Sequence, residues 1–213
     1  MPKGLGSLIM RGFLRVIWRL SASRDLQGIE SAVFVEDYAP CFARIDQALE
    51  LIVRYDPGTL QHMRELFRGI LVFGNERFRA ASWNTSADLC VLTEWYVQSK
   101  TFRPEDLALT LIHESMHARL SKAGVHYRDG RRAAIEVLCA MAELRFAKRV
   151  ITDPSLRESA ERRIDEWAKQ GERQWSDHTM REAKLGYLRE LGTPNWIVSV
   201  VGRLGQFINR RAA

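Results

Sequence analysis

The chain has 213 residues, 46% of them hydrophobic and 27% charged, which is enough apolar material to bury the core of one domain. Its cysteines, Cys41, Cys90 and Cys139, show no paired spacing, which argues against a disulfide scaffold and is typical of a reducing compartment. The net charge of +6 belongs to the ends, because residues 1–20 and 196–213 carry seven basic and no acidic side chains, so a diffuse nucleic-acid-binding surface is not expected.

The first predicted element is an amphipathic helix over residues 7–20. Arg11, Arg15 and Arg19 form one basic stripe, and apolar side chains cover most of the remaining surface. Such a helix can lie on an anionic membrane, or it can dock on the protein body or a partner. The segment does not resemble a signal peptide, because arginines interrupt its apolar run at every fourth residue, and no apolar run is long enough to span a bilayer. We therefore expect a cytoplasmic protein, with a peripheral membrane or partner contact through residues 1–20 as an open alternative.

Helices are predicted next over residues 39–54 and 58–68, among short extended segments. The extended segments are residues 32–35, 71–73, 77–82 and 88–98. The last two flank Asn84-Thr85-Ser86, a turn signal, and therefore predict a hairpin. This pattern predicts an α+β fold that is mainly helical, with a small antiparallel sheet before the helices that follow.

The helix predicted over residues 104–122 contains His113-Glu114-Ser115-Met116-His117, an H-E-x-x-H motif. Two histidines four residues apart are offset by only about 40° around a helix, so both imidazoles can bind one Zn²⁺. Glu114 can then act as the general base toward the water at that metal. The alternative is a helix with two partly buried histidines and a solvated glutamate.

A candidate for the third zinc ligand stands on the next predicted helix, over residues 131–150. Eighteen residues separate His117 from Glu136, which has apolar neighbours in the sequence. A carboxylate among apolar residues is costly unless it is paired or coordinated. A hydrolytic zinc site takes three protein ligands and leaves one position open, so Glu136 would complete the set.

The sequence H-E-x-x-H, eighteen residues and then Glu resembles that of the gluzincin zinc metallopeptidases, the thermolysin and aminopeptidase group. The resemblance covers about a quarter of the chain, roughly residues 103–150. It implies Zn²⁺ as the cofactor and a peptide or protein as the substrate. The implied ligands are His113, His117 and Glu136, and the implied general base is Glu114.

The chain departs from that pattern at one position. Thermolysin-like peptidases place an aspartate four residues after the ligand glutamate, where it orients the first histidine, but Ala140 stands there. Glu143 lies on the same helix face as Glu136 and is our candidate for the group that hydrogen-bonds to a metal ligand and orients it. Its alternative is an ion pair with Arg132, Arg145 or Lys148.

The resemblance also suggests residues that would contact a substrate. A histidine or tyrosine near such a site often stabilises the oxyanion, and His126 or Tyr127 could take that role; the alternative is a surface pair of loop aromatics. A substrate peptide can add to an edge strand beside the cleft. Residues 91–97, with Trp95 and Tyr96, are the candidate strand, and a core strand is the alternative.

Other zinc-site patterns fit less well. The metzincin spacing needs a histidine six residues after His117, where Ala123 stands, so that class is excluded. His126 lies too far along the chain to share the helix face of His113 and His117, so it could bind the same metal only if a loop brought it back to them. A cysteine ligand followed by H-E-x-x-H resembles the zinc site of peptide deformylase, but the residues that flank Cys90 do not resemble that enzyme's cysteine motif. The ordinary alternative is that Cys90 is a buried core residue.

Three further helices are predicted over residues 155–170, 178–190 and 194–210. The last is amphipathic and basic, and it can dock on the body or contact a membrane. The expected organisation is a basic N-terminal segment (1–20), a zincin-like domain (21–192) and a basic C-terminal helix (193–213). The sequence thus predicts a zinc metallopeptidase. The alternative is a non-catalytic binding or scaffold protein with a structural or relic zinc site, associating through its basic ends.

Overall fold

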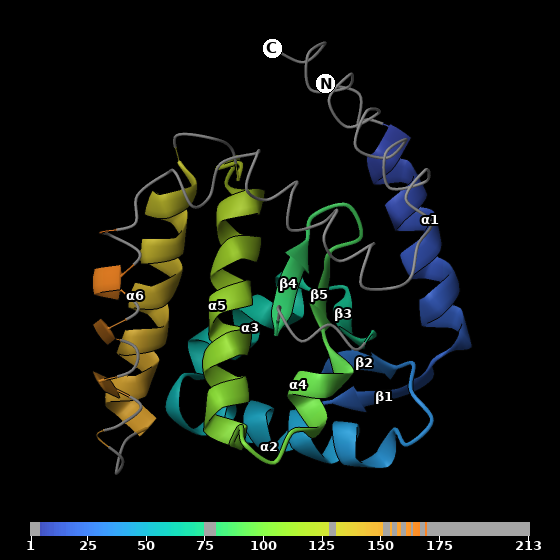
Figure 1. Cartoon of the computed structure of the whole chain (residues 1–213), viewed down its shortest axis with the longest axis horizontal. Helices are drawn as coiled ribbons and strands as arrows, with labels where there is room; N and C mark the ends of the chain where they lie inside the picture. Colours follow the sequence, from blue (N-terminus) through green and yellow to red (C-terminus); the bar gives the residue numbers. More distant parts are fainter. Residues whose placement is uncertain are drawn as a thin grey trace, which may run out of the picture.

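Figure 1 shows the computed structural model of the chain, which describes residues 5–74, 80–127 and 131–150 and, beyond these, residues 154, 157, 158, 161, 162, 164–166 and 169. A five-stranded sheet lies between helix α1 (Leu5–Leu20) on one face and a layer of helices on the other. The fold is therefore α+β and mainly helical, as the sequence predicts. Within the described ranges, every helix is too short or too polar to cross a bilayer.

The sheet is mixed, with the strand order β1-β2-β3-β5-β4. The strands are β1 (Ala22–Leu26), β2 (Ile29–Val33), β3 (Gly69–Val72), β4 (Ala81–Asn84) and β5 (Leu89–Leu92). The predicted antiparallel arrangement is wrong at the centre, because β2, β3 and β5 run parallel and only β1 and β4 pair antiparallel. Parallel neighbours need a long crossover, and two helices supply it between β2 and β3.

Strand β1 was not predicted, because its residues carry little apolar periodicity and three of its five side chains are exposed. It is formed through the hairpin that it makes with β2. Gln27 and Gly28 both have positive φ, 53° and 77°, which suits the tight two-residue turns of hairpins. Asp25 Oδ1 accepts a hydrogen bond of 3.0 Å from the Gly28 amide and fixes this turn.

The two faces of the sheet bury separate apolar clusters. On one face Leu14, Ile17 and Trp18 of α1 pack against a smaller cluster that includes Leu71 and Leu89. On the other face the strands contribute to the larger core, which also contains residues of the helices described below. Gly69 permits the close approach of α1, since a Cβ there would collide with the Trp18 ring and the Glu30 carbonyl oxygen. The N-terminal segment is thus packed on the body along one side.

The helices before the H-E-x-x-H motif lie where the sequence predicts them. They are α2 (Ala39–Tyr55) and α3 (Pro57–Leu66), and both have a proline in the first turn. Helix α5 spans Pro104–Lys122 and carries the motif. Asp106 Oδ2 accepts a 2.7 Å hydrogen bond from the Arg103 amide, so the helix start is fixed by a local cap. Leu107 and Leu111 bury α5 in the larger core, which gives the motif a rigid base.

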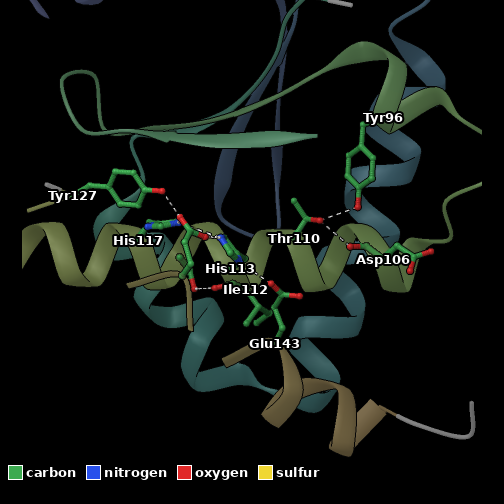
Figure 2. Close-up of polar contacts among 10 residues, drawn as sticks. Tyr96, Asp106, Thr110, Ile112, His113, His117, Tyr127 and Glu143 are labelled. Carbon is green, nitrogen blue, oxygen red and sulfur yellow. Dashed lines mark hydrogen bonds and ion pairs between the residues drawn. The ribbon is translucent and has the colours of Figure 1, made fainter. Parts of the chain in front are cut away.

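The predicted extended segment 88–98 is wrong beyond Leu92, because residues Glu94–Gln98 form a short helix, α4. Tyr96 is buried in this helix, and the centre of its ring lies 4.6 Å from that of Phe102. Its hydroxyl lies 2.8 Å from Thr110 Oγ1 of α5 (Figure 2). Strand β5 is also interior to the sheet, between β3 and β4. Residues 91–97 are therefore neither one strand nor an edge strand, and they cannot accept a substrate strand.

Helix α6 (Arg132–Val150) lies beside α5 and runs back along it, as Figure 1 shows. Its start and end agree with the predicted helix over residues 131–150. The described residues between 154 and 169 are helical, within the helix predicted over 155–170. The predicted helices over 178–190 and 194–210 and residues 77–79 of the predicted extended segment 77–82 lie outside the described residues. The end of that segment enters strand β4.

Candidate metal centre

The motif side chains of α5 meet the inward face of α6. His113 and His117, one helical turn apart, lie on the side of α5 that faces α6. Glu136, Cys139 and Glu143 are buried on α6 at spacings of three and four residues, which place them along one face of a helix. Two helices that are adjacent in the chain therefore bring all of these side chains into one buried cluster.

Three ligand-type groups converge closely within this cluster. His113 Nε2 lies 3.1 Å from His117 Nε2. The Glu136 carboxylate lies 3.2 Å from His113 Nε2 and 3.5 Å from His117 Nε2. Tetrahedral zinc with bonds of about 2.0–2.1 Å holds its ligand atoms roughly 3.3 Å apart. The observed spacings fit such an ion with little movement of the side chains.

Glu143 takes the position that orients the first histidine. Its Oε1 lies 2.6 Å from His113 Nδ1, and Figure 2 shows the two side chains reaching toward each other between the helices. With Nδ1–H donating to this carboxylate, the other nitrogen, Nε2, is left facing Glu136 and His117. Ala140, which stands where an aspartate would be in thermolysin-like peptidases, is fully buried. Glu143, one turn later on α6, makes the contact instead.

The charges in the cluster are mutually dependent. Burial acts to lower the pKa of His113, but hydrogen bonds with Glu136 and Glu143 outweigh burial and raise that pKa to about 10. Burial likewise acts to raise the pKa of Glu136, while its contacts with His113 and His117 lower it. Without metal, His113 is therefore a cation held between two carboxylates. A zinc ion bound at this site would have to displace that proton, so any affinity for zinc should fall as pH falls.

Glu114 is buried, with only 5% of its surface exposed. After burial itself, the charge of Glu114 is the main influence that raises the pKa of the Cys90 thiol on β5. It also contributes to the raised pKa values of Cys139 on α6 and of His113. The carboxylate therefore lies within electrostatic reach of the sheet, of α6 and of the first histidine, inside the protein rather than in solvent.

The two loop candidates, His126 and Tyr127, have different positions. His126 is exposed. Tyr127 donates a 2.6 Å hydrogen bond from its hydroxyl to Glu136 Oε1, and its ring lies 5.6 Å from that of His117 (Figure 2). The guanidinium of Arg132, at the start of α6, lies 5.3 Å from the Tyr127 ring. Tyr127 thus belongs to the cluster and at present contacts a candidate ligand.

Cys139 is not among the ligands expected from the sequence, but the structure places it in the cluster. Cys139 Sγ and a nitrogen of each of His113 and His117 all lie within 4.8 Å of one another. The thiol is fully buried. Its spacing of three residues from Glu136 was the signal that could have identified it. The Glu136 oxygens are closer to the histidines, so we take Glu136 as the third ligand and Cys139 as the competing one. Cys90 is not among these grouped atoms.

Replacing Glu143 with glutamine is expected to weaken zinc binding about 10- to 100-fold, since loss of a group that hydrogen-bonds to a metal-bound histidine typically costs this much affinity. The amide keeps the shape but not the charge that favours the Nδ1–H tautomer of His113. Zinc affinity measured by competition with a chromogenic chelator would show the change. Glu50→Gln, at an exposed position on α2, is the matched control. Equal zinc affinity in both variants would leave Glu143 without an orienting role.

Comparison with known protein families, curated proteins and solved structures finds no match for this chain. The function has to be argued from the residues and their geometry.

Proposed function

We propose that the protein is a zinc-dependent metallopeptidase. The observation that carries the proposal is the convergence of His113, His117 and Glu136 at the mutual spacing of zinc ligands, with Glu114 next to the first histidine in the chain. Three protein ligands and an open fourth position are typical of catalytic zinc sites. A glutamate beside the first histidine of H-E-x-x-H is placed to act as a general base.

Each residue of the cluster has a distinct part in peptide hydrolysis. When bound, zinc would polarise the scissile carbonyl and make water a better nucleophile. Glu114 takes a proton from the attacking water and gives it to the leaving amine. Glu143 holds His113 in the tautomer that offers Nε2. Tyr127 is close enough to stabilise the oxyanion, provided that its hydroxyl leaves Glu136 when substrate enters.

A substrate peptide can pair with strand β4. Within the part of the chain that the structure describes, β4 pairs on one side only, with β5, and so forms an edge of the sheet. It is also close to α5, the helix that carries the motif. An exposed edge can bind an extended peptide through main-chain hydrogen bonds, with little demand on side chains. Strand β4 thus replaces residues 91–97 as the candidate substrate strand.

The test of this proposal is the metal content and activity of the full chain. Protein purified without added metal should contain about one zinc per chain, and it should cleave an unfolded protein substrate. A chelator should remove both zinc and cleavage, and added zinc should restore both. Zinc-loaded protein that leaves a panel of unfolded proteins and peptides intact would contradict the peptidase assignment.

Cys139 supports the alternative, a non-catalytic protein with a structural zinc site. If its thiolate joined His113, His117 and Glu136, all four positions would come from the protein. Structural zinc sites are closed in this way, and no position is left for water. With four protein ligands, the zinc ion would stabilise the fold and could not activate a water molecule. The number of protein ligands therefore separates the two functions.

The variant Cys139→Ala distinguishes an open catalytic zinc site from a closed structural one. An open site predicts that the variant keeps its zinc and its hydrolytic activity, whereas a closed site predicts a sharp loss of zinc affinity. Cobalt-substituted protein gives a direct readout, because a thiolate ligand adds a strong near-ultraviolet charge-transfer band that Cys139→Ala would abolish. Cys41→Ala, at another fully buried thiol, controls for the cavity. The metallopeptidase proposal expects both variants to behave alike and the band to be absent in the parent protein.

A further inference from the structure

Helix α1 has a second apolar surface that the sheet does not cover. Leu14, Ile17 and Trp18 are buried against the strands. A neighbouring side of the helix exposes Phe13, Val16 and Leu20, with 47%, 56% and 66% of their surfaces accessible. These three residues are spaced by three and four positions and so form one strip along the helix. Further exposed apolar side chains on α1 are those of Leu8 and Met10.

The exposed strip continues onto the sheet. The Phe13 ring lies 5.6 Å from that of Phe73, just after β3, and the Phe73 ring lies 6.1 Å from that of Phe34, just after β2. Phe34 is itself 39% exposed. We call Phe13, Val16, Leu20 and Phe34 the α1 outer patch. Contiguous exposed apolar surface of this kind marks an interaction site more often than isolated apolar residues do.

A basic strip borders the outer patch. Arg15 and Arg19 are exposed and one helical turn apart, and Arg11 precedes them at the same spacing. Helix α1 contains no acidic residue. On a helical projection Arg19 lies beside Val16, so charge and apolar surface face outward together. The occupant of this surface must therefore offer negative charge directly beside an apolar region.

We infer that α1 binds the surface of an anionic lipid bilayer. Arginines at the headgroup level would meet anionic phosphates, while the outer patch would enter the boundary of the acyl chains. A second copy of the chain docked through the same surface would bring two arginine strips together, and the C-terminal segment of residues 193–213 carries only basic charged side chains of its own. Both would be repelled by Arg15 and Arg19, so charge complementarity favours the membrane.

Co-sedimentation of the full chain with vesicles tests this inference. Binding to phosphatidylcholine vesicles that contain phosphatidylserine should be strong, and binding to pure phosphatidylcholine should be weak. Raising the salt from ~0.1 to ~1 M shortens the Debye length from ~10 to ~3 Å and should reduce the binding. Arg15→Gln with Arg19→Gln should lower the affinity about 25-fold, since each basic residue near such a surface contributes roughly 5-fold.

Val16→Ser with Leu20→Ser should also release the protein from the vesicles. Because both side chains are more than half exposed, the variant should keep the parent thermal unfolding midpoint. Val53→Ser with Arg54→Gln, at exposed positions on α2, is the matched control and should bind as the parent does. Equal binding by the α1 variants, or equal binding to neutral vesicles, would overturn the inference. Sedimentation without vesicles that the α1 variants abolish would instead identify a second copy of the chain as the occupant.

Discussion

Glu114→Gln is expected to abolish hydrolysis while leaving the fold and the zinc in place. Glutamine has nearly the same shape, so it should fit the buried position of Glu114. Its amide cannot accept the proton of the attacking water, and loss of a general base typically costs about 10²- to 10⁴-fold in rate. The measurements are kcat/KM on an unfolded protein substrate and zinc per chain by atomic absorption.

The matched control is Glu105→Gln, which lies two turns earlier on the same helix, away from the histidines. It should retain both activity and zinc. If Glu114→Gln instead loses its zinc, Glu114 is a ligand rather than a base. If it keeps full activity, the proton is transferred by another group, and the assignment of the mechanism to Glu114 is wrong.

His117→Ala and Glu136→Ala are each expected to lower zinc affinity by more than roughly 100-fold. That is the upper loss expected when a group that only hydrogen-bonds to a ligand is removed. The reason is that three ligands share one ion, and each alanine removes one of them. His113→Ala should do the same, with an additional loss of stability. It leaves Glu136 and Glu143 buried without the imidazole between them, and breaking a buried ion pair costs about 3–5 kcal/mol.

Zinc affinity and the free energy of unfolding should be measured together for these variants, so that loss of metal is not confused with loss of fold. His126→Ala, in the exposed loop before α6, is the control and should keep its zinc. If Glu136→Ala keeps full zinc affinity, Glu136 is not a ligand. The third ligand would then be Cys139, the next group close to both histidines. The site would then still have three protein ligands and an open position, so the peptidase proposal would stand with Cys139 in place of Glu136.

The parts of the fold that local signals determine could be predicted from the sequence. Helix α5 begins at Pro104, where Asp106 caps the chain, and both residues are visible in the sequence. The four-residue spacing of His113 and His117 fixes their common face whatever surrounds the helix. The position of Glu136 is different, because it depends on how a loop turns α6 back against α5. Its proximity to the histidines was expected from its apolar neighbours in the sequence and from the family resemblance, and no local signal fixes it.

The parts that depend on distant partners could not be predicted. The segment Glu94–Gln98 has strand-forming side chains, but contacts of Tyr96 with Phe102 and Thr110 stabilise a helix there. Strand β1 depends on its pairing with β2 rather than on its own apolar content. The choice between Glu143 as an ion-pair partner of nearby cations and as a partner of His113 is likewise decided by the packing of α5 on α6.

The sheet separates α1 from the pair of helices, α5 and α6, that carries the candidate metal centre, as Figure 1 shows. A molecule attached through α1 would therefore turn its catalytic side toward the aqueous phase, with the sheet standing between lipid and substrate. Anchoring would change where hydrolysis takes place without blocking access to the centre. The rate constants of the attached and free protein should then be the same, while substrates tethered to the same bilayer would be favoured by proximity alone.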